Sequence, residues 1–347
     1  YAFIGRPTSK DRSMEIFNGE KKVAAFDINE MRAAWYETSY LLDRRQSFNG
    51  MADERVKNYA YQPLEFKFNA DFTGKLEQYG LKEGARSGNG EPVAAIIREK
   101  GTNGEREMAY ALYLAGFRVK DVMMTDLIAG RETLEDVQMI VFCGGFSNSD
   151  VLGSAKGWAG AFLYNPKAKE ALDKFYARED TMSLGICNGC QLMVELGLVG
   201  VTADFKAKMR HNTSHKFEST YVALRISNET NSIMLKSLKG NKIGVWVAHG
   251  EGKFSLPDRV ENYDIAAQYN YATYPGNPNG SDYATAAICS ADGRHLAMMP
   301  HPERAIFPWQ CANYPADRRF EDITPWMEAF VNARIWCSSH CSGHSSK

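Results

Sequence analysis

The amino-acid sequence predicts an α/β fold of the flavodoxin-like type, with a mostly parallel sheet, helices on both faces of the sheet and an antiparallel extension. Two observations lead to this prediction. Between residues 93 and 196, short apolar segments of strand character alternate with segments of helical periodicity, a pattern typical of parallel βαβ units. From residue 218 onward, strand-like segments follow one another, which indicates antiparallel pairing.

The first fifty residues contain one predicted helix, over residues 28–46. Apolar side chains recur there at helical spacing among arginines and glutamates, at Ile28, Met31, Trp35, Leu41 and Leu42. Two interpretations of this amphipathic helix remain open: it packs against the rest of the chain, or it docks against a body outside the chain. Residues 47–91 are polar and irregular, and the glycine-rich stretch 80–92 has the composition of a linker.

The main domain begins after this linker. Its parallel strands are predicted at residues 93–98, 118–124, 137–143 and 181–186, and its helices at residues 105–114, 167–176 and 188–196. The extension is predicted to contain strands at residues 218–226, 243–247, 265–269, 284–289 and 296–299. Functional loops gather at the carboxyl ends of such strands, so Cys143-Gly144, Cys187 and His301 are candidates for one common site.

Cys187 lies where a predicted strand turns directly into a helix, in Gly185-Ile186-Cys187-Asn188-Gly189. Such a corner strains its central residue, and glycines two positions before and after it relieve the crowding, which is the pattern of a nucleophile elbow. The sulfur then lies at a helix N-terminus, where the helix dipole and free N–H groups favour thiolate over thiol. The N–H of Asn188 is placed to donate to an oxyanion.

Two other interpretations of Cys187 start from the same residues. A free cysteine is often a small core residue. Cys187 and Cys190 also form a C-x-x-C pair, which occurs in redox and zinc sites. The strand pattern does not suggest a thioredoxin-like domain, and the only other close pair, Cys337 and Cys341, lies at the extreme C-terminus. We therefore expect no metal site.

His301-Pro302-Glu303 supplies a candidate base and a carboxylate to orient it. A residue before proline is pushed toward extended geometry, where side chains two positions apart point the same way. Glu303 is then expected to accept a hydrogen bond from one imidazole nitrogen while the other nitrogen faces the thiol. In the alternative, His301 caps a strand and Glu303 pairs with Arg304, but the elbow at Cys187 favours a catalytic arrangement.

The chain carries further short motifs in a fixed order. They are Cys143-Gly-Gly-Phe-Ser147, Gly185-Ile-Cys-Asn-Gly-Cys-Gln191, Arg210-His-Asn-Thr-Ser214, His249-Gly-Glu-Gly252, Tyr274-Pro-Gly-Asn-Pro-Asn-Gly-Ser281 and Met299-Pro-His-Pro-Glu-Arg304. Together they resemble class I (triad) glutamine amidotransferases, and among these most closely the glutaminase domains of the long-form phosphoribosylformylglycinamidine synthases of purine biosynthesis. One departure is visible at Asn148-Ser149, where the family commonly has tyrosine-glycine.

The resemblance implies a reaction and a set of site residues. It implies that Cys187, His301 and Glu303 form a catalytic triad that hydrolyses glutamine through a glutamyl thioester and releases ammonia. The backbone N–H groups of Gly145 and Asn188 would form the oxyanion hole. Side chains that would hold the glutamine are Gln191, Asn212 and Ser214.

The resemblance also implies how the chain is organised. Residues 92–336 would be the glutaminase domain, residues 1–50 a helical tail of the synthetase portion, residues 51–91 a linker and residues 337–347 a polar tail. The chain, which begins with tyrosine, is accordingly expected to be a C-terminal fragment of a larger protein. The synthetase portion would be its partner, and ATP and Mg²⁺ would serve that portion, with no cofactor in this chain.

Composition argues against several other functions. The formal net charge is −1, so the composition indicates no broad cationic field that would attract nucleic acid or an anionic membrane. No apolar run approaches the length needed to span a bilayer. Seven cysteines without regular spacing argue against a secreted disulfide framework, and a working thiolate fits a reducing, cytoplasmic compartment. Three alternatives stay open: a cysteine hydrolase or peptidase-like enzyme on this fold, a glutaminase of another pathway, and a docking module without activity.

Overall fold

A nine-stranded sheet forms the centre of the computed structural model, which describes residues 5–6, 11–81 and 90–340. The strand order is β11-β10-β13-β14-β15-β8-β6-β3-β5. The parallel half contains β3 (Val93–Arg98), β5 (Arg118–Met123), β6 (Met139–Phe142), β8 (Met182–Ile186) and β15 (His295–Met298). The antiparallel half contains β10 (Glu218–Ile226), β11 (Lys242–His249), β13 (Ile265–Tyr269) and β14 (Thr285–Cys289). The predicted flavodoxin-like class with an antiparallel extension is confirmed.

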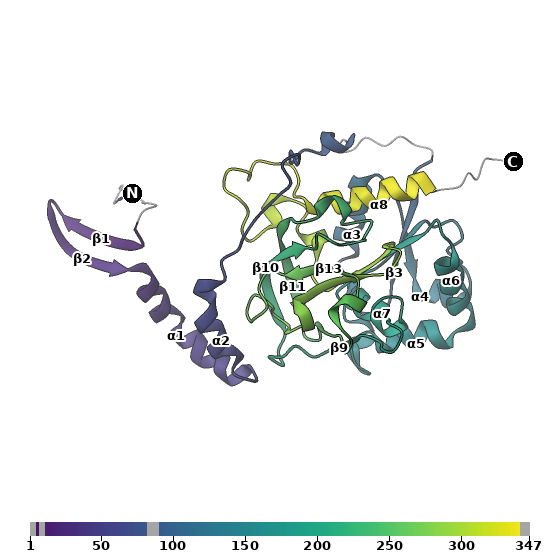
Figure 1. Ribbon diagram of the computed structural model, residues 1–347, viewed down its shortest axis with the longest axis horizontal. Helices are drawn as coiled ribbons and strands as arrows, with labels where there is room; N and C mark the ends of the chain where they lie inside the picture. The colour runs from purple at the N-terminus through teal and green to yellow at the C-terminus, as the bar shows by residue number, and fades with distance from the viewer. Residues whose placement is uncertain (1–4, 7–10, 82–89, 341–347) are drawn as a thin grey trace.

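Helices cover both faces of the sheet. On one side α3 (Glu105–Ala115) packs against α8 (Trp326–His340), and on the other α5 (Lys156–Tyr164) contacts α6 (Pro166–Ala177) and α7 (Asn188–Leu196) (Figure 1). A short helix, α4 (Met124–Ala129), also contacts α6. Because the inner parallel strands β3, β6 and β8 are covered on both faces, their side chains are almost continuously apolar and buried, whereas most side chains of the edge strand β5 are exposed or half-buried. None of the helices described is both long and apolar enough to cross a membrane.

The N-terminal segment differs from the prediction in two places. A hairpin of β1 (Ser13–Asn18) and β2 (Lys21–Asp27) precedes the helix, and residues expected to be irregular form α2 (Met51–Asn58). The prediction missed α2 because its buried side chains are limited to Met51 and Ala52, too few to give a periodic apolar pattern.

Helix α1 (Ile28–Gln46) has the predicted bounds, and the Asp27 side chain caps it by accepting hydrogen bonds from two N–H groups of its first turn. Figure 1 shows the hairpin and α1 standing away from the sheet. The apolar side chains of α1 are exposed, and Trp35 is 88% exposed. The helix nevertheless contacts the rest of the chain through other residues, such as Asp43, which pairs with Lys216, so packing against this chain and docking against a body outside it both stay open.

The remaining differences concern short elements and the C-terminus. Helices α4, α5 and α8 were not predicted, nor were the short strands β4 (Thr102–Asn103), β7 (Gly144–Gly145), β9 (Lys208–Arg210) and β12 (Lys253–Ser255). Helix α8 continues through residues 337–340, with Cys337 buried, where a polar tail was expected. Residues 341–347 of that predicted tail, and residues 82–89 of the predicted linker, lie outside the described residues.

Helix α7 packs so closely on β6 that a side chain cannot fit between them. A Cβ on Gly189 would lie 2.0 Å from the carbonyl oxygen of Phe142 and 2.5 Å from its carbonyl carbon. This approach sets the start of α7 beside the carboxyl ends of β6 and β8, where the candidate residues of the site lie.

Replacing Gly189 by alanine is expected to destabilise the fold by about 3 kcal/mol, because the added methyl group overlaps backbone atoms that cannot move aside. Chemical denaturation measures this change. Gly160→Ala in α5 is the matched control, since its Cβ would meet nothing closer than a tyrosine ring atom at 3.8 Å. Equal stability of Gly189→Ala and the wild type would contradict the close packing.

Candidate active site

Cys187 occupies the corner between β8 and α7 in a left-handed backbone conformation, with φ 53° and ψ −105°. A residue other than glycine rarely adopts positive φ, and surrounding structure must impose it. Gly185 provides the space, because a Cβ there would lie 2.5 Å from the carbonyl oxygen of Gly189. The structure thus places Cys187, which is 5% exposed, on the strained corner that the glycine spacing predicts.

The carboxylate of Glu303 lies against the imidazole of His301. Glu303 Oε1 is 2.7 Å from His301 Nδ1, and both side chains are 2% exposed. The prediction of an extended segment at His301–Glu303 is wrong. Residues Pro302–Arg304 form a 3₁₀ turn, and proline suits the first position of such a turn. The alternative partner, Arg304, makes only a longer contact of 3.8 Å with the same carboxylate oxygen.

His301 and Cys187 meet beside Gly144. A Cβ on Gly144 would lie 3.0 Å from Cε1 of His301 and 3.5 Å from Cβ of Cys187, so only glycine fits between them. Within the part of the chain that the structure describes, the buried Nε2 of His301 has no hydrogen-bond acceptor or donor assigned to it. The Cys187 thiol itself donates to the carbonyl oxygen of Ala248, with 3.6 Å between Sγ and that oxygen.

Two buried histidines in this region have pKa values shifted in opposite directions. Burial lowers the pKa of His249 to about 3, and the charge of His301 acts in the same direction. Burial also lowers the pKa of His301, but the charge of Glu303 and the contact with Cys187 outweigh it and raise that pKa to about 9. The carboxylate of Glu303 is therefore what lets His301, unlike His249, hold a proton at neutral pH.

A cavity of about 420 Å³ opens beside Cys187. Three residues that the sequence singled out line it, Gly145, Cys187 and Gln191. The sequence interpretation missed the other lining residues, although most of them lie in or beside the recognised motifs: Phe146, Asp150, Ser154, His211, His215, Lys216, Phe217, Ala248, His249, Gly250 and Glu251. The wall carries carboxylates as well as basic groups, and burial and the charge of Glu251 raise the pKa of Asp150.

Side-chain amides join three segments on one side of this cavity. Asn188 Oδ1 accepts the N–H of Ser147 at 3.0 Å, and Asn188 Nδ2 donates to Gln191 Oε1 at 2.9 Å. Gln191 Nε2 in turn donates to the carbonyl of Glu251 at 2.8 Å. Gln191 is 4% exposed, so it is not a solvent-exposed helix residue.

The candidate oxyanion donors lie at the same end of the sheet. Gly145, with φ 110°, forms part of β7 opposite β4, and a Cβ there would lie 2.6 Å from the carbonyl oxygen of Gly101. Asn188 is the first residue of α7, where backbone N–H groups have no partner within the helix. Beyond Gly145 the chain continues with Asn148 and Ser149, both at positive φ and neither on the cavity wall.

Asn212 and Ser214 do not line the cavity. The Asn212 side chain donates to the carbonyls of Lys216 and His249 and accepts the N–H of Gly252, and Ser214 Oγ donates to Glu218. Both side chains are buried and their hydrogen bonds go to the protein itself. Direct contact between either side chain and glutamine stays a prediction.

No group of three or more histidine, cysteine, aspartate or glutamate side chains is placed to hold a metal ion among residues 5–6, 11–81 and 90–340. Cys187 and Cys190 are both free thiols. Burial raises the pKa of Cys190 well above its ordinary value, and the charge of Cys187 adds to this effect. Cys341, which the zinc alternative required, lies outside the described residues.

Glu303→Gln is expected to remove a pH-dependent part of the stability. The pKa of His301 is raised from 6.5 to about 9, so its proton stabilises the folded state fully below pH 6.5, and this stabilisation is lost as the pH rises through 9. The difference in unfolding free energy between wild type and variant should be about 3 kcal/mol larger at pH 6 than at pH 10. Denaturant titrations across this range measure it. A difference that does not change with pH would refute the charged pair.

Comparison with known proteins gives the same picture of the fold. The model of the CobB/CobQ-like glutamine amidotransferase domain matches residues 91–337. Among solved structures, PurLQS from Thermotoga maritima is similar with a TM-score of 0.55 and 23% identity, over 71% of this chain and 99% of that chain. That likeness supports the fold.

Curated relatives match most of the chain. Phosphoribosylformylglycinamidine synthase of Homo sapiens is 40% identical over 343 residues, which cover 89% of this chain and 25% of the human protein. The protein of the same name from Dictyostelium discoideum is 37% identical over 350 residues, 92% of this chain and 25% of that protein. The chain thus spans about a quarter of the length of these relatives. With the family model matching residues 91–337, the chain belongs to the family of CobB/CobQ-like glutamine amidotransferase domains.

Proposed function

We propose that this chain is the glutaminase portion of a phosphoribosylformylglycinamidine synthase, which hydrolyses glutamine and supplies ammonia to a synthetase portion of the same longer polypeptide. The observation that carries the proposal is the strained Cys187 beside the buried His301–Glu303 pair, at the edge of a cavity of amino-acid size. The names of the relatives support the choice of synthase.

Cys187 acts as the nucleophile. Because the pKa of His301 is raised to about 9, the thiol proton passes to its Nε2 and leaves a thiolate at the N-terminus of α7. The thiolate attacks the carboxamide carbon of glutamine. His301 then gives the proton to the leaving nitrogen, which departs as ammonia, and a glutamyl thioester remains on Cys187.

Water completes the cycle. Neutral His301 takes a proton from the water, whose oxygen attacks the thioester carbon, and glutamate leaves as the Cys187 thiolate is restored. Glu303 holds the imidazole through Nδ1 in both steps. The N–H groups of Gly145 and Asn188 stabilise the oxyanion that forms in each step.

The cavity suits an amino acid as substrate. Glutamine carries both an ammonium and a carboxylate, and the cavity wall offers the carboxylates of Asp150 and Glu251 together with the ammonium of Lys216. Gln191 positions the Glu251 loop, and Asn212 and Ser214 hold the opposite loop through hydrogen bonds to His249 and Glu218.

The ammonia would convert formylglycinamide ribonucleotide to the amidine in the synthetase portion. ATP and Mg²⁺ would serve that portion, because Gly144–Gly145 forms a short strand against β4 and does not open a helix that could hold phosphate. The free thiols of the described residues favour a cytoplasmic location.

A diazo-ketone analogue of glutamine is expected to add once to this chain, on Cys187, and excess glutamine should prevent the addition. Intact mass with peptide mapping measures it, and Cys187→Ala is the control that should remain unlabelled. If the analogue does not react while iodoacetamide still alkylates Cys187, the thiol is reactive but the cavity does not take glutamine. Peptide cleavage by the same chain would then favour the cysteine hydrolase.

Asn188→Ala is expected to lower kcat for glutamine by roughly 10- to 100-fold with a smaller change in KM. The substitution removes the hydrogen bond that holds the Ser147 backbone, and with it the Gly145 N–H, in place for the oxyanion. Steady-state glutaminase kinetics measure both constants. Asn332→Ala, which removes a buried asparagine bonded to Met234 and Ser237 in another region, is the control and should leave kcat unchanged. An equal effect of both substitutions would contradict a specific role for Asn188.

A further inference from the structure

One wall of the candidate glutamine cavity is a loop that we call the pocket loop, residues 211–218. His211, His215, Lys216 and Phe217 of this loop line the cavity. His215 has φ 54°, a left-handed conformation that a residue other than glycine keeps only when its surroundings hold it. The shape of this wall therefore depends on what packs behind it.

The N-terminal helices lie behind the pocket loop and hold its backbone. The N–H of Phe48 donates to the carbonyl of Ser214 at 2.9 Å, and Asn49 Nδ2 donates to the carbonyl of Thr213 at 3.0 Å. The Phe48 ring also packs against the His215 ring, with 5.1 Å between their centroids. Three consecutive loop residues are thus fixed by the turn between α1 and α2.

Charged side chains make the second connection. Asp43, at the end of α1 and 7% exposed, pairs with Lys216 of the pocket loop and lies 3.6 Å from Arg55 Nε on α2. Arg55 Nη2 reaches Glu218 Oε2 at 3.2 Å, and Glu218 Oε1 accepts the Ser214 hydroxyl at 2.6 Å. The four charged side chains therefore form a row in which bases and acids alternate, in the order Lys216, Asp43, Arg55 and Glu218.

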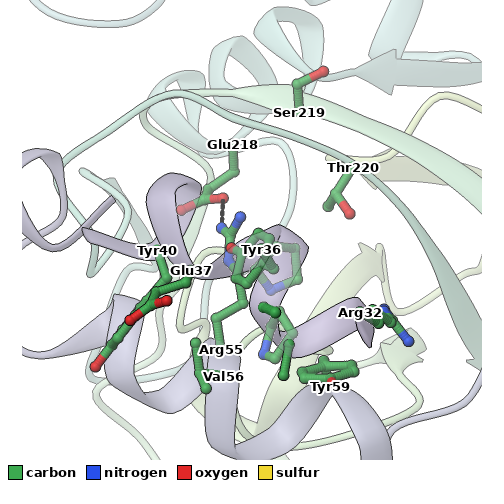
Figure 2. Close-up of a pocket in the computed structure, with 14 residues that line it drawn as sticks. Arg32, Tyr36, Glu37, Tyr40, Arg55, Val56, Tyr59, Glu218, Ser219 and Thr220 are labelled. Carbon is green, nitrogen blue, oxygen red and sulfur yellow. Dashed lines mark hydrogen bonds and ion pairs between the residues drawn. The ribbon is translucent and has the colours of Figure 1, made fainter. Parts of the chain in front are cut away.

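Figure 2 shows this junction from the side of a second cavity, of about 700 Å³. Arg55 on α2 reaches across to Glu218, while Tyr36 and Tyr40 of α1 line the same space. Glu218 is 3% exposed, so its charge depends on Arg55 and on hydrogen bonds from the Ser214 and Tyr274 hydroxyls. Loss of one partner would leave a buried charge uncompensated and allow the loop to shift.

We propose that Asp43 and Arg55 are positioning residues for the glutamine cavity: they hold the pocket loop, and through Lys216 they set the wall against which the substrate binds. The functional glutaminase unit then extends beyond the family segment 91–337 to include α1 and α2. This inference rests on the proposed function, since it names residues that shape the site for glutamine.

The rate of Cys187 labelling by the diazo-ketone analogue tests the proposal in the whole 347-residue chain. Its dependence on analogue concentration separates the half-saturating concentration from the maximal rate. Asp43→Asn is expected to raise the half-saturating concentration about tenfold and to change the maximal rate less than twofold. Alkylation of Cys187 by iodoacetamide should stay within twofold of the wild type, because Asp43 does not touch the thiol.

Matched variants separate positioning from general stability. Asp53→Asn breaks an exposed pair with Arg44 in the same two helices and should leave labelling unchanged. Asn49→Gly removes the neutral hydrogen bond to the Thr213 carbonyl from an exposed side chain and keeps the backbone at φ 56°, which glycine adopts without strain, so the chain stays folded. It should raise the half-saturating concentration about threefold. In a chain that already carries Lys216→Met, Asp43→Asn should raise the half-saturating concentration less than threefold further, because most of the effect of Asp43 passes through Lys216.

An unchanged half-saturating concentration in Asp43→Asn and Asn49→Gly would overturn the proposal. A parallel fall of the maximal labelling rate and of iodoacetamide reactivity would also overturn it, because that result marks a merely structural role. The failure of the proposed function looks different, since the wild-type chain itself would then not be labelled by the analogue.

Discussion

The strained corner at Cys187 is the constraint on which the rest of the site depends. It exists because Gly185 and Gly189 let α7 approach the sheet to backbone contact, and that approach leaves the thiol at the first turn of the helix. The N–H of Cys187 also bonds to the carbonyl of Met298 at 2.9 Å, on the strand that leads to His301. One hydrogen-bonded sheet thus brings together residues more than a hundred positions apart in the chain.

Burial and the neighbouring carboxylate together set the pKa of His301. In a site without the carboxylate, as at His249, burial leaves an imidazole neutral at physiological pH. Glu303 reverses this effect at His301, and the energetic cost of burying two charges is offset by a short hydrogen bond and by the nearby thiol. The two histidines show how one neighbouring carboxylate decides whether a buried imidazole carries a proton.

The cavity is assembled from segments that secondary structure alone does not connect. Side-chain amides of Asn188 and Gln191 link Ser147, just beyond β7, with α7 and the loop that contains Glu251 on one side of the cavity. The opposite wall, the pocket loop, is held from behind by α1 and α2, which lie outside the segment matched by the family. The shape of the cavity is thus tied to a part of the chain that contributes none of Cys187, His301 and Glu303.

The sequence by itself determined the fold class, the bounds of α1 and of most core strands, and the candidate residues Cys187, His301 and Glu303, which the structure brings to one site. It could do so because apolar periodicity and glycine spacing act locally, over a few residues. Only the tertiary structure decided the rest. The short helix α2 has too few buried residues to show a pattern, and the 3₁₀ turn at Pro302–Arg304 brings Glu303 to His301 by a path that the extended prediction did not contain. The side-chain contacts of Asp43, Arg55 and Asn188 were equally hidden, because each joins partners distant in sequence, and a contact of this kind is defined only once the chain has folded.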